Sequence, residues 1–184
     1  TVGTLLGFAL HSPVPDKQAQ GQGQGHGEGP PPKQQEEPPP LLAIGTKAPD
    51  FTLSDSTGKA HTLSKYLGKK AVLLEMFATW CPHCQSTTFH VKVLKKELGS
   101  KFDVLAINAG DQPGQPDSSA DFKKVFKIDY PILSKAPKEL MDSYGLHSFP
   151  TFYLIDKDGV IRWAYRGGLN PFSYDELAGI IQGL

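Results

Sequence analysis

The chain has 184 residues, with 19 Lys and Arg against 19 Asp and Glu, and only two cysteines. Residues 13–40 hold 8 Pro, 5 Gly and 6 Gln in 28 positions, so this segment cannot bury enough apolar surface to offset its chain entropy. The remaining residues, 41–184, are the size of one domain and carry 17 basic and 15 acidic side chains. This near neutrality argues against a nucleic-acid-binding surface, and two cysteines cannot staple a small scaffold.

The composition divides the chain into three segments. Residues 1–12 open with the apolar run TVGTLLGFAL, which is too short to cross a bilayer because a spanning helix takes about 20 residues. We interpret this run as the remnant of a signal or membrane anchor, with a disordered tail as the alternative. Residues 13–43 are expected to form a disordered linker with a reach of roughly 30 Å. Residues 44–184 are expected to fold.

The first elements of the folded segment alternate between turns and apolar runs. Residues 51–53 and 60–63 flank the turn 55–58 and predict a β-hairpin, followed by a helical turn at 64–67. The apolar runs 71–78 and 102–108 predict strands that are buried on both faces. Residues 82–98 between them predict a helix that Gly99 ends, with an apolar stripe made of Phe89, Val93, Leu94 and Leu98.

The remaining pattern completes a mixed α/β architecture. After a turn-rich loop at 109–119, the sequence predicts an extra helix at 120–126, a short strand at 131–133, a helix at 138–144, a hairpin at 151–155 and 160–165, and a helix at 173–181 with Ser173 as N-cap. This order predicts a central mixed β-sheet flanked by helices on both faces.

Both cysteines lie in the tetrapeptide Cys81-Pro82-His83-Cys84, where a buried strand leads into a helix. Free backbone N–H groups and the helix dipole favour a negative charge at the helix N-terminus, so Cys81 is predicted to be the attacking thiolate. Pro82 suits the first helical turn because its missing N–H is not needed there. Cys84, one turn further and more buried, is predicted to resolve the mixed disulfide. His83 either stabilises the thiolate or is a solvent-facing helix residue.

Two other uses of a CxxC pair fit this sequence poorly. A zinc site would need further ligands, but there is no second CxxC, and the remaining histidines lack ligand spacing. A structural disulfide within CxxC would close a tiny loop and constrain little of the unfolded chain. We therefore expect a redox pair that needs neither metal nor organic cofactor.

The segment 44–184 resembles the thioredoxin superfamily, most closely the TlpA/ResA-like, redoxin-related extracytoplasmic thiol–disulfide oxidoreductases. The resemblance is carried by GTKAPDFTL at the start, the hairpin, FATWCPHC, the extra helix after LAIN, and SFPTFYLIDKDGVI. It implies a thioredoxin fold with an N-terminal β-hairpin and a helical insert. It also implies a location outside the cytoplasm, a monomer, and protein partners that bear disulfides or thiols, together with a membrane or thioredoxin-type electron partner.

The resemblance assigns further roles around the cysteines. Pro150 matches the cis proline that faces the redox pair, and Phe149 precedes it where the partner backbone docks. Trp80 would shield the pair, with core packing as the alternative. Gly167 and Gly168 would lie beside Pro150, or be ordinary turn glycines. The predicted partner-binding residues are therefore Trp80, Pro82, Phe149, Pro150 and Gly167.

Glu75 is a carboxylate within the apolar strand LLEMF. A buried carboxylate is costly unless it is partnered or protonated, so its pKa should be raised. In thioredoxins the matching acid relays the proton of the second cysteine, which implies that role for Glu75 toward Cys84. The alternative is an edge-facing or salt-bridged glutamate.

The motif and the scaffold suggest opposite redox directions. CPHC resembles the thiol oxidases of the bacterial periplasm, whereas TlpA/ResA-like scaffolds are typical of reductases. Relatives devoted to cytochrome c maturation carry acidic residues near the motif, but Gln85–Phe89 contains none, and the peroxiredoxin pattern PxxxTxxC is absent around both cysteines. The prediction is a thiol–disulfide oxidoreductase. The alternatives are a cytochrome c maturation thioredoxin, a peroxidase-like redoxin and a non-catalytic binding module.

Overall fold

The structure, a computed structural model, describes residues 37–111 and 114–184. The predictions for residues 1–12, and for the linker up to residue 36, lie outside the described residues. The described part contains a five-stranded sheet whose order is β5 (Ile132–Leu133), β4 (Phe102–Asn108), β3 (Ala71–Phe77), β6 (Thr151–Ile155) and β7 (Ile161–Arg166). Strands β3, β4 and β5 are parallel, whereas β6 runs antiparallel to both β3 and β7. The predicted mixed sheet is confirmed.

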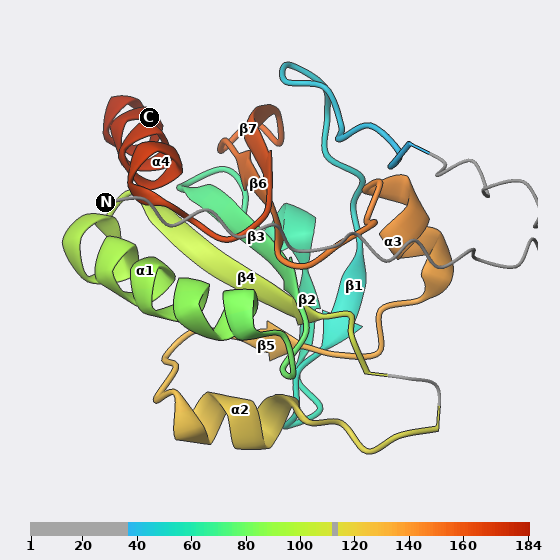
Figure 1. The fold of residues 1–184 in the computed structure, drawn as a ribbon. Coiled ribbons are helices and arrows are strands. Elements are labelled where there is room, and N and C mark those ends of the chain that lie inside the picture. Colours follow the sequence, from blue (N-terminus) through green and yellow to red (C-terminus); the bar gives the residue numbers. More distant parts are fainter. Residues whose placement is uncertain (1–36, 112–113) are drawn as a thin grey trace, which may run out of the picture. The chain divides into compact units, whose positions relative to one another are not determined.

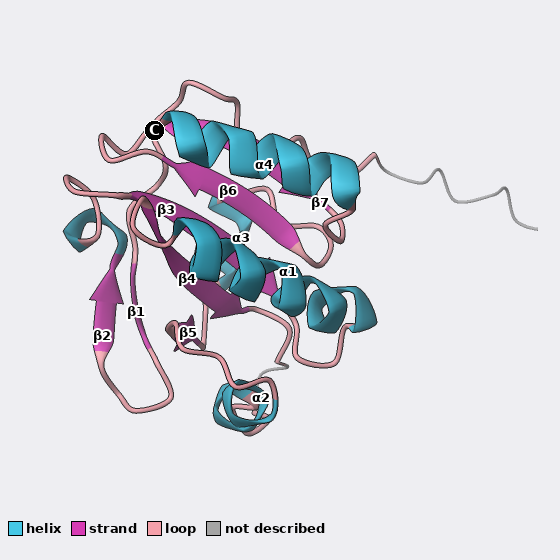
Figure 2. Cartoon of the chain, turned by 90° about the vertical axis from the view of Figure 1, so that its left-hand side faces the viewer, coloured by secondary structure: helices cyan, strands magenta, loops and turns pink. Residues whose placement is uncertain are grey.

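Helices cover both faces of this sheet (Figure 1, Figure 2). The elements outside the sheet are β1 (Thr52–Ser54), β2 (Ala60–Thr62), the 3-10 turn η1 (Leu63–Lys65), α1 (Pro82–Leu98), α2 (Ser119–Val125), α3 (Lys138–Ser143) and α4 (Pro171–Gly183). One apolar cluster joins the sheet to α1, α2 and α4, and a second joins it to α3, η1 and the β1–β2 hairpin. The predicted N-terminal hairpin and the extra helix, α2, are both present.

The central strand β3 is buried along its whole length. Because side chains alternate across a strand, Leu73 and Phe77 enter the cluster beneath α1, whereas Leu74 and Met76 enter the opposite one. This double burial explains the continuous apolar pattern of the segment. It also places Glu75, between Leu73 and Phe77 in the alternation, on the face beneath α1.

Two details of the predicted helices are wrong. Phe89 is 72% exposed, because α1 turns Cys84, Thr87, Thr88, Val91 and Leu94 toward the sheet instead of the predicted stripe, of which only Leu94 is buried. The N-cap of α4 is Asn170, not Ser173. The Asn170 side chain accepts the Ser173 N–H, and the Ser173 hydroxyl accepts the Asn170 N–H, so the two residues form a capping box.

Ordered contacts of the domain begin ahead of residue 44. The Arg166 guanidinium donates to the carbonyl oxygens of Pro39 (2.8 Å) and Gly145 (2.9 Å). The Leu42 amide donates to the Tyr153 hydroxyl, and its side chain packs on the second apolar cluster. The stretch from Pro39 to Leu42 is therefore attached to the domain, and Arg166 connects it to the strand that ends at the candidate site.

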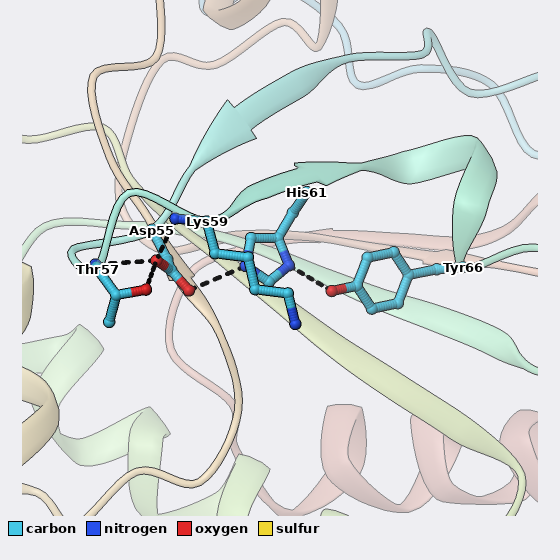
Figure 3. A network of polar contacts seen from close by, with 5 residues as sticks. All are labelled: Asp55, Thr57, Lys59, His61 and Tyr66. Carbon is cyan, nitrogen blue, oxygen red and sulfur yellow. Dashed lines mark hydrogen bonds and ion pairs between the residues drawn. The ribbon is translucent and has the colours of Figure 1, made fainter.

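A polar network holds the β1–β2 hairpin closed (Figure 3). The carboxylate of Asp55 accepts hydrogen bonds from the Thr57 amide (2.9 Å) and hydroxyl (2.6 Å), and from the Lys59 amide (3.1 Å). The buried His61 contacts Asp55 through Nε2 (2.9 Å) and the Tyr66 hydroxyl through Nδ1. Burial acts in the opposite direction, but these hydrogen bonds lower the pKa of Asp55 below its ordinary value of 3.8.

The first prediction concerns Asp55→Asn. Removing the charge that holds this network should lower the free energy of unfolding by about 1.5–3 kcal/mol at pH 7. Because the pKa is lowered in the folded state, the ionised Asp55 stabilises the protein fully above pH 3.8, and this stabilisation is lost progressively as the pH falls below 3.8 toward the folded value. Chemical denaturation of both proteins between pH 7 and pH 3 should therefore show their difference shrinking in acid. A difference that stays constant over this range would contradict the network's role.

Candidate active site

Cys81 lies where β3 leads into α1 at the carboxyl end of the central strand. It is the N-cap of α1 with an extended backbone (φ −81°, ψ 118°), and Pro82 follows in the first turn, as predicted. Its thiol donates to the Phe149 carbonyl oxygen at 3.8 Å. The residue is buried, but 7% of its surface remains exposed. The helix N-terminus stabilises negative charge at this position.

Cys84 lies one turn deeper and is completely buried. Both cysteines are free thiols in the structure. Burial raises the pKa of the Cys84 thiol far above its ordinary value, and the neighbouring Cys81 and Glu75 raise it further. Cys84 is therefore protonated at neutral pH and needs a proton acceptor before it can attack a disulfide.

Glu75 is buried in the middle of β3, paired with Ala106 of β4 and Phe152 of β6. Its Oε1 has no hydrogen-bond partner among the described residues. Burial raises the pKa of Glu75 from 4.5 to about 8, in the direction that the sequence predicted. The edge position and salt bridge considered as alternatives are not found in the described structure.

The Phe149–Pro150 peptide bond is cis. Its loop lies against Cys81, because the Phe149 carbonyl oxygen is the acceptor of the Cys81 thiol. The Gly167 amide donates to the Pro150 carbonyl oxygen at 2.8 Å, and Gly167 has φ +118°, a conformation that favours glycine. The structure thus brings together Cys81, Phe149, Pro150 and Gly167, which the sequence grouped only through a resemblance.

Trp80, which directly precedes Cys81, exposes an aromatic side chain beside the Phe149 ring. Its side chain is 61% exposed and meets the Phe149 ring edge-on, with ring centroids 6.0 Å apart. The indole N–H is already used, since it donates to the Gly110 carbonyl oxygen at 3.0 Å. The exposed surface of Trp80 is therefore apolar, and its exposure disfavours core packing as its sole role.

His83 and Pro82 lie on the exposed side of the first turn of α1. A Cβ added to Gly168 would come 3.6 Å from His83 Cβ and 3.7 Å from His83 Nδ1, so the glycine loop packs against this histidine. In the described part of the chain, no hydrogen bond joins His83 to either cysteine sulfur, and the Cys81 thiol is paired with the Phe149 carbonyl group. Its role in stabilising a thiolate stays a prediction.

A polar network that the sequence analysis missed holds the loop that carries Trp80. The buried Asn108, at the end of β4, donates to Asp111 (2.8 Å) and Ser118 (3.2 Å), and the hydroxyls of Ser118 and Thr79 are 2.7 Å apart. Gly110 is equally constrained, because an added Cβ would lie 2.2 Å from Ala78 Cβ. Asn108, a polar residue directly after the apolar run from Val104 to Ile107, was the available signal.

Within residues 37–111 and 114–184, no group of three or more His, Cys, Asp or Glu is arranged to hold a metal ion. In the same residues, no helix combines the length and the apolar composition needed to cross a bilayer.

Comparison with known proteins assigns the family. The AhpC/TSA family model matches residues 44–164. The chain is 32% identical over 127 residues to the thiol-disulfide oxidoreductase ResA of Geobacillus thermodenitrificans, covering 68% of this chain and 71% of the relative. The chain belongs to the AhpC/TSA family.

Solved structures support the fold. A protein described as the thiol:disulfide interchange protein DsbE of Chlorobium tepidum matches with a TM-score of 0.68 and 25% identity, over 77% of this chain and 97% of that one. The exposed lipoprotein thioredoxin of Streptococcus pneumoniae matches with a TM-score of 0.58 and 31% identity, over 74% of this chain and 100% of that one. The predicted thioredoxin fold is therefore confirmed.

The second prediction concerns Glu75→Gln. A pKa raised from 4.5 to about 8 means that the folded state binds more protons than the unfolded state between these values, so stability falls as the pH rises. Relative to the wild type, the variant should gain stability from pH 5 to pH 8, by about 1.4 kcal/mol per pH unit in the middle of this window. Urea unfolding at each pH measures the difference.

The matched control for this experiment is Glu97→Gln, which changes an exposed glutamate on α1 and should leave the pH dependence of stability as in the wild type. A stability difference between Glu75→Gln and the wild type that does not vary with pH would contradict the burial of an ionisable Glu75.

Proposed function

We propose that this thiol–disulfide oxidoreductase exchanges disulfides with partner proteins through Cys81 and Cys84. The observation that carries the proposal is the unequal environment of the two thiols. Cys81 keeps an exposed fraction of 7% at the N-terminus of α1, beside the Phe149 carbonyl group, whereas Cys84, one turn further along the helix, is completely buried. One thiol is thus available to an external disulfide and the other only to its neighbour.

In the first step, the Cys81 thiolate attacks one sulfur of a partner disulfide. A bond forms between Cys81 and that sulfur, and the second partner sulfur leaves as a thiolate that takes up a proton. The chain and its partner are then joined by a mixed disulfide. The cis proline segment beside Cys81 supports this step by offering the partner backbone a fixed place to lie.

In the second step, Cys84 attacks Cys81. Cys84 must first lose its proton, and Glu75, buried on the same face of the sheet, accepts it when ionised, a form that becomes more populated as the pH approaches 8. The Cys81–Cys84 disulfide forms, and the remaining partner sulfur leaves as a thiolate. Reading the steps backward oxidises a partner dithiol, so the reduction potential of the pair decides the direction.

The partner-binding surface in this proposal consists of Trp80, Pro82, Phe149, Pro150 and Gly167. The apolar faces of Trp80 and Phe149 suit the side chains that flank a partner's cysteine, while Gly167 keeps the loop beside Pro150 free of bulk. Partners are therefore thiol- or disulfide-bearing proteins. His83, exposed between the two cysteines, would tune the thiolate of Cys81.

We further propose that the domain works outside the cytoplasm, attached by its N-terminal segment and recharged by a membrane or thioredoxin-type electron partner. Two features support this: the apolar run of residues 1–12 with the Pro-, Gly- and Gln-rich sequence that follows it, and the 31% identity to a structure described as an exposed lipoprotein thioredoxin. A linker with a reach of roughly 30 Å would let the redox surface meet partners near a membrane.

The third prediction separates the roles of the two cysteines. Cys81→Ser should reduce the rate of insulin reduction, with dithiothreitol as electron source, to the uncatalysed background, because the attacking sulfur is gone. Cys84→Ser should still attack but stall, so mass spectrometry should find a mixed disulfide on Cys81. Wild-type activity in Cys81→Ser would contradict the proposal, as would an adduct on Cys84 in that variant.

A further inference from the structure

A series of contacts that starts at Cys81 connects the segments around the two cysteines. The Cys81 thiol meets the Phe149 carbonyl oxygen at 3.8 Å, and across the next peptide bond the Pro150 carbonyl oxygen accepts the Gly167 amide at 2.8 Å. The cis proline segment is therefore held on one side by the cysteine and on the other by the glycine loop after β7. Where that loop is attached decides where the proline segment sits.

The loop is attached to the helix that carries the cysteines. Two residues after Gly167, the Leu169 amide donates to Thr87 Oγ1 at 3.3 Å. Both residues are buried, with Thr87 one turn beyond Cys84 on α1. A Cβ added to Gly168 would lie 3.6 Å from the same Oγ1, so the backbone of the loop rests directly on this threonine. The series of contacts therefore begins at Cys81 and ends at Thr87 of the same helix, α1.

Thr87 differs in this respect from the threonine beside it. Thr88 is equally buried, but its hydroxyl donates to the Cys84 carbonyl oxygen within α1 itself, an ordinary contact for a helical threonine. Thr87 instead accepts from an amide 82 positions further along the chain. A hydrogen bond between segments so far apart fixes the position of one element against another, which a bond inside the helix does not do.

We propose that Thr87 is a positioning residue for the exchange reaction, a role that rests on the proposed function of Cys81 and Cys84. By holding the Leu169 amide, it fixes the glycine loop on α1. Through the bond from Gly167 to Pro150, it then sets the distance between the partner-binding segment and Cys81. Without the Thr87 hydroxyl, the buried Leu169 amide loses its acceptor and the loop must move to regain one.

The test replaces Thr87 by valine, which keeps the shape but removes the acceptor. Displacement of the proline segment should impair docking of a protein but not the reactivity of Cys81 with a small disulfide. Insulin reduction should lose about tenfold in kcat/KM, mainly through a higher KM, because small displacements of a bound substrate are costly. The rate with the small aromatic disulfide dithionitrobenzoate should stay within about twofold. Thr87→Ser should restore insulin reduction.

Thr88→Val is the matched control, since it removes a hydroxyl of equal burial from the same helix while the Cys84 carbonyl keeps its backbone helix bond. It should reduce insulin as the wild type does. Amide hydrogen exchange provides a second readout: exchange at Leu169 and Gly167 should accelerate in Thr87→Val and not in Thr88→Val.

Several results would overturn the positioning role. They are equal losses with insulin and with the small disulfide, no loss with insulin, or no rescue by serine. If the valine variant does not fold, Thr87→Ser and Thr87→Ala differ only in the hydroxyl, and equal insulin activity of that pair would count against it. A wild type that fails to reduce insulin would instead refute the proposed function, so the two failures are distinguishable.

Discussion

The register between β3 and β6 is the constraint on which the site depends. Because these strands are antiparallel, the pairing of Met76 with Thr151 places the start of β6 beside the end of β3. Cys81 follows one strand and Pro150 precedes the other, so a single register brings the thiol and the proline segment together. The next pairing, Thr151 with Arg166, brings Gly167 to the same edge. A shift of one residue would turn Glu75 away from the face beneath α1 and dismantle the site.

Burial then gives each group of the site a different chemistry. Cys81 keeps a small exposed fraction, while Cys84 and Glu75 are fully buried between α1 and the sheet. The same desolvation that keeps the Cys84 thiol protonated raises the pKa of Glu75 toward the range where it can exchange a proton. The single carboxylate of an otherwise wholly apolar central strand is therefore in an environment that shifts its pKa strongly.

Strong local patterns were enough to predict most of the fold. The buried-strand pattern predicted the bounds of β4, the hairpin pattern predicted those of β6, and the Cys-Pro start and the glycine stop predicted those of α1. Prediction from apolar patterns failed where the buried side chains are polar. The buried face of α1 contains the polar residues Thr87 and Thr88. A stripe through Phe89 contains more apolar residues, so the apolar pattern favoured the wrong face of the helix. The same misreading hid Thr87, the residue that joins α1 to the glycine loop.

Other parts of the site could not be obtained from sequence periodicity at all. The proximity of Gly167 to Pro150, and of Phe149 to Cys81, arises from pairing between strands that are far apart in the chain, and only a family resemblance suggested it. The brace from Asn108 to Ser118 depends on side-chain geometry in a loop whose sequence shows only turn formers. Local composition does not predict contacts between residues that are far apart in the chain.

The proposed difference in accessibility between the thiols of Cys81 and Cys84 is tested most directly by alkylating the reduced protein and following each cysteine separately. Iodoacetamide is added at pH 7, the reaction is stopped at intervals, and peptide mass spectrometry follows each cysteine separately. Cys81 should be modified first, while Cys84 stays unmodified until the protein unfolds. Modification of both cysteines at equal rates in the folded protein, or of Cys84 first, would contradict this difference in accessibility.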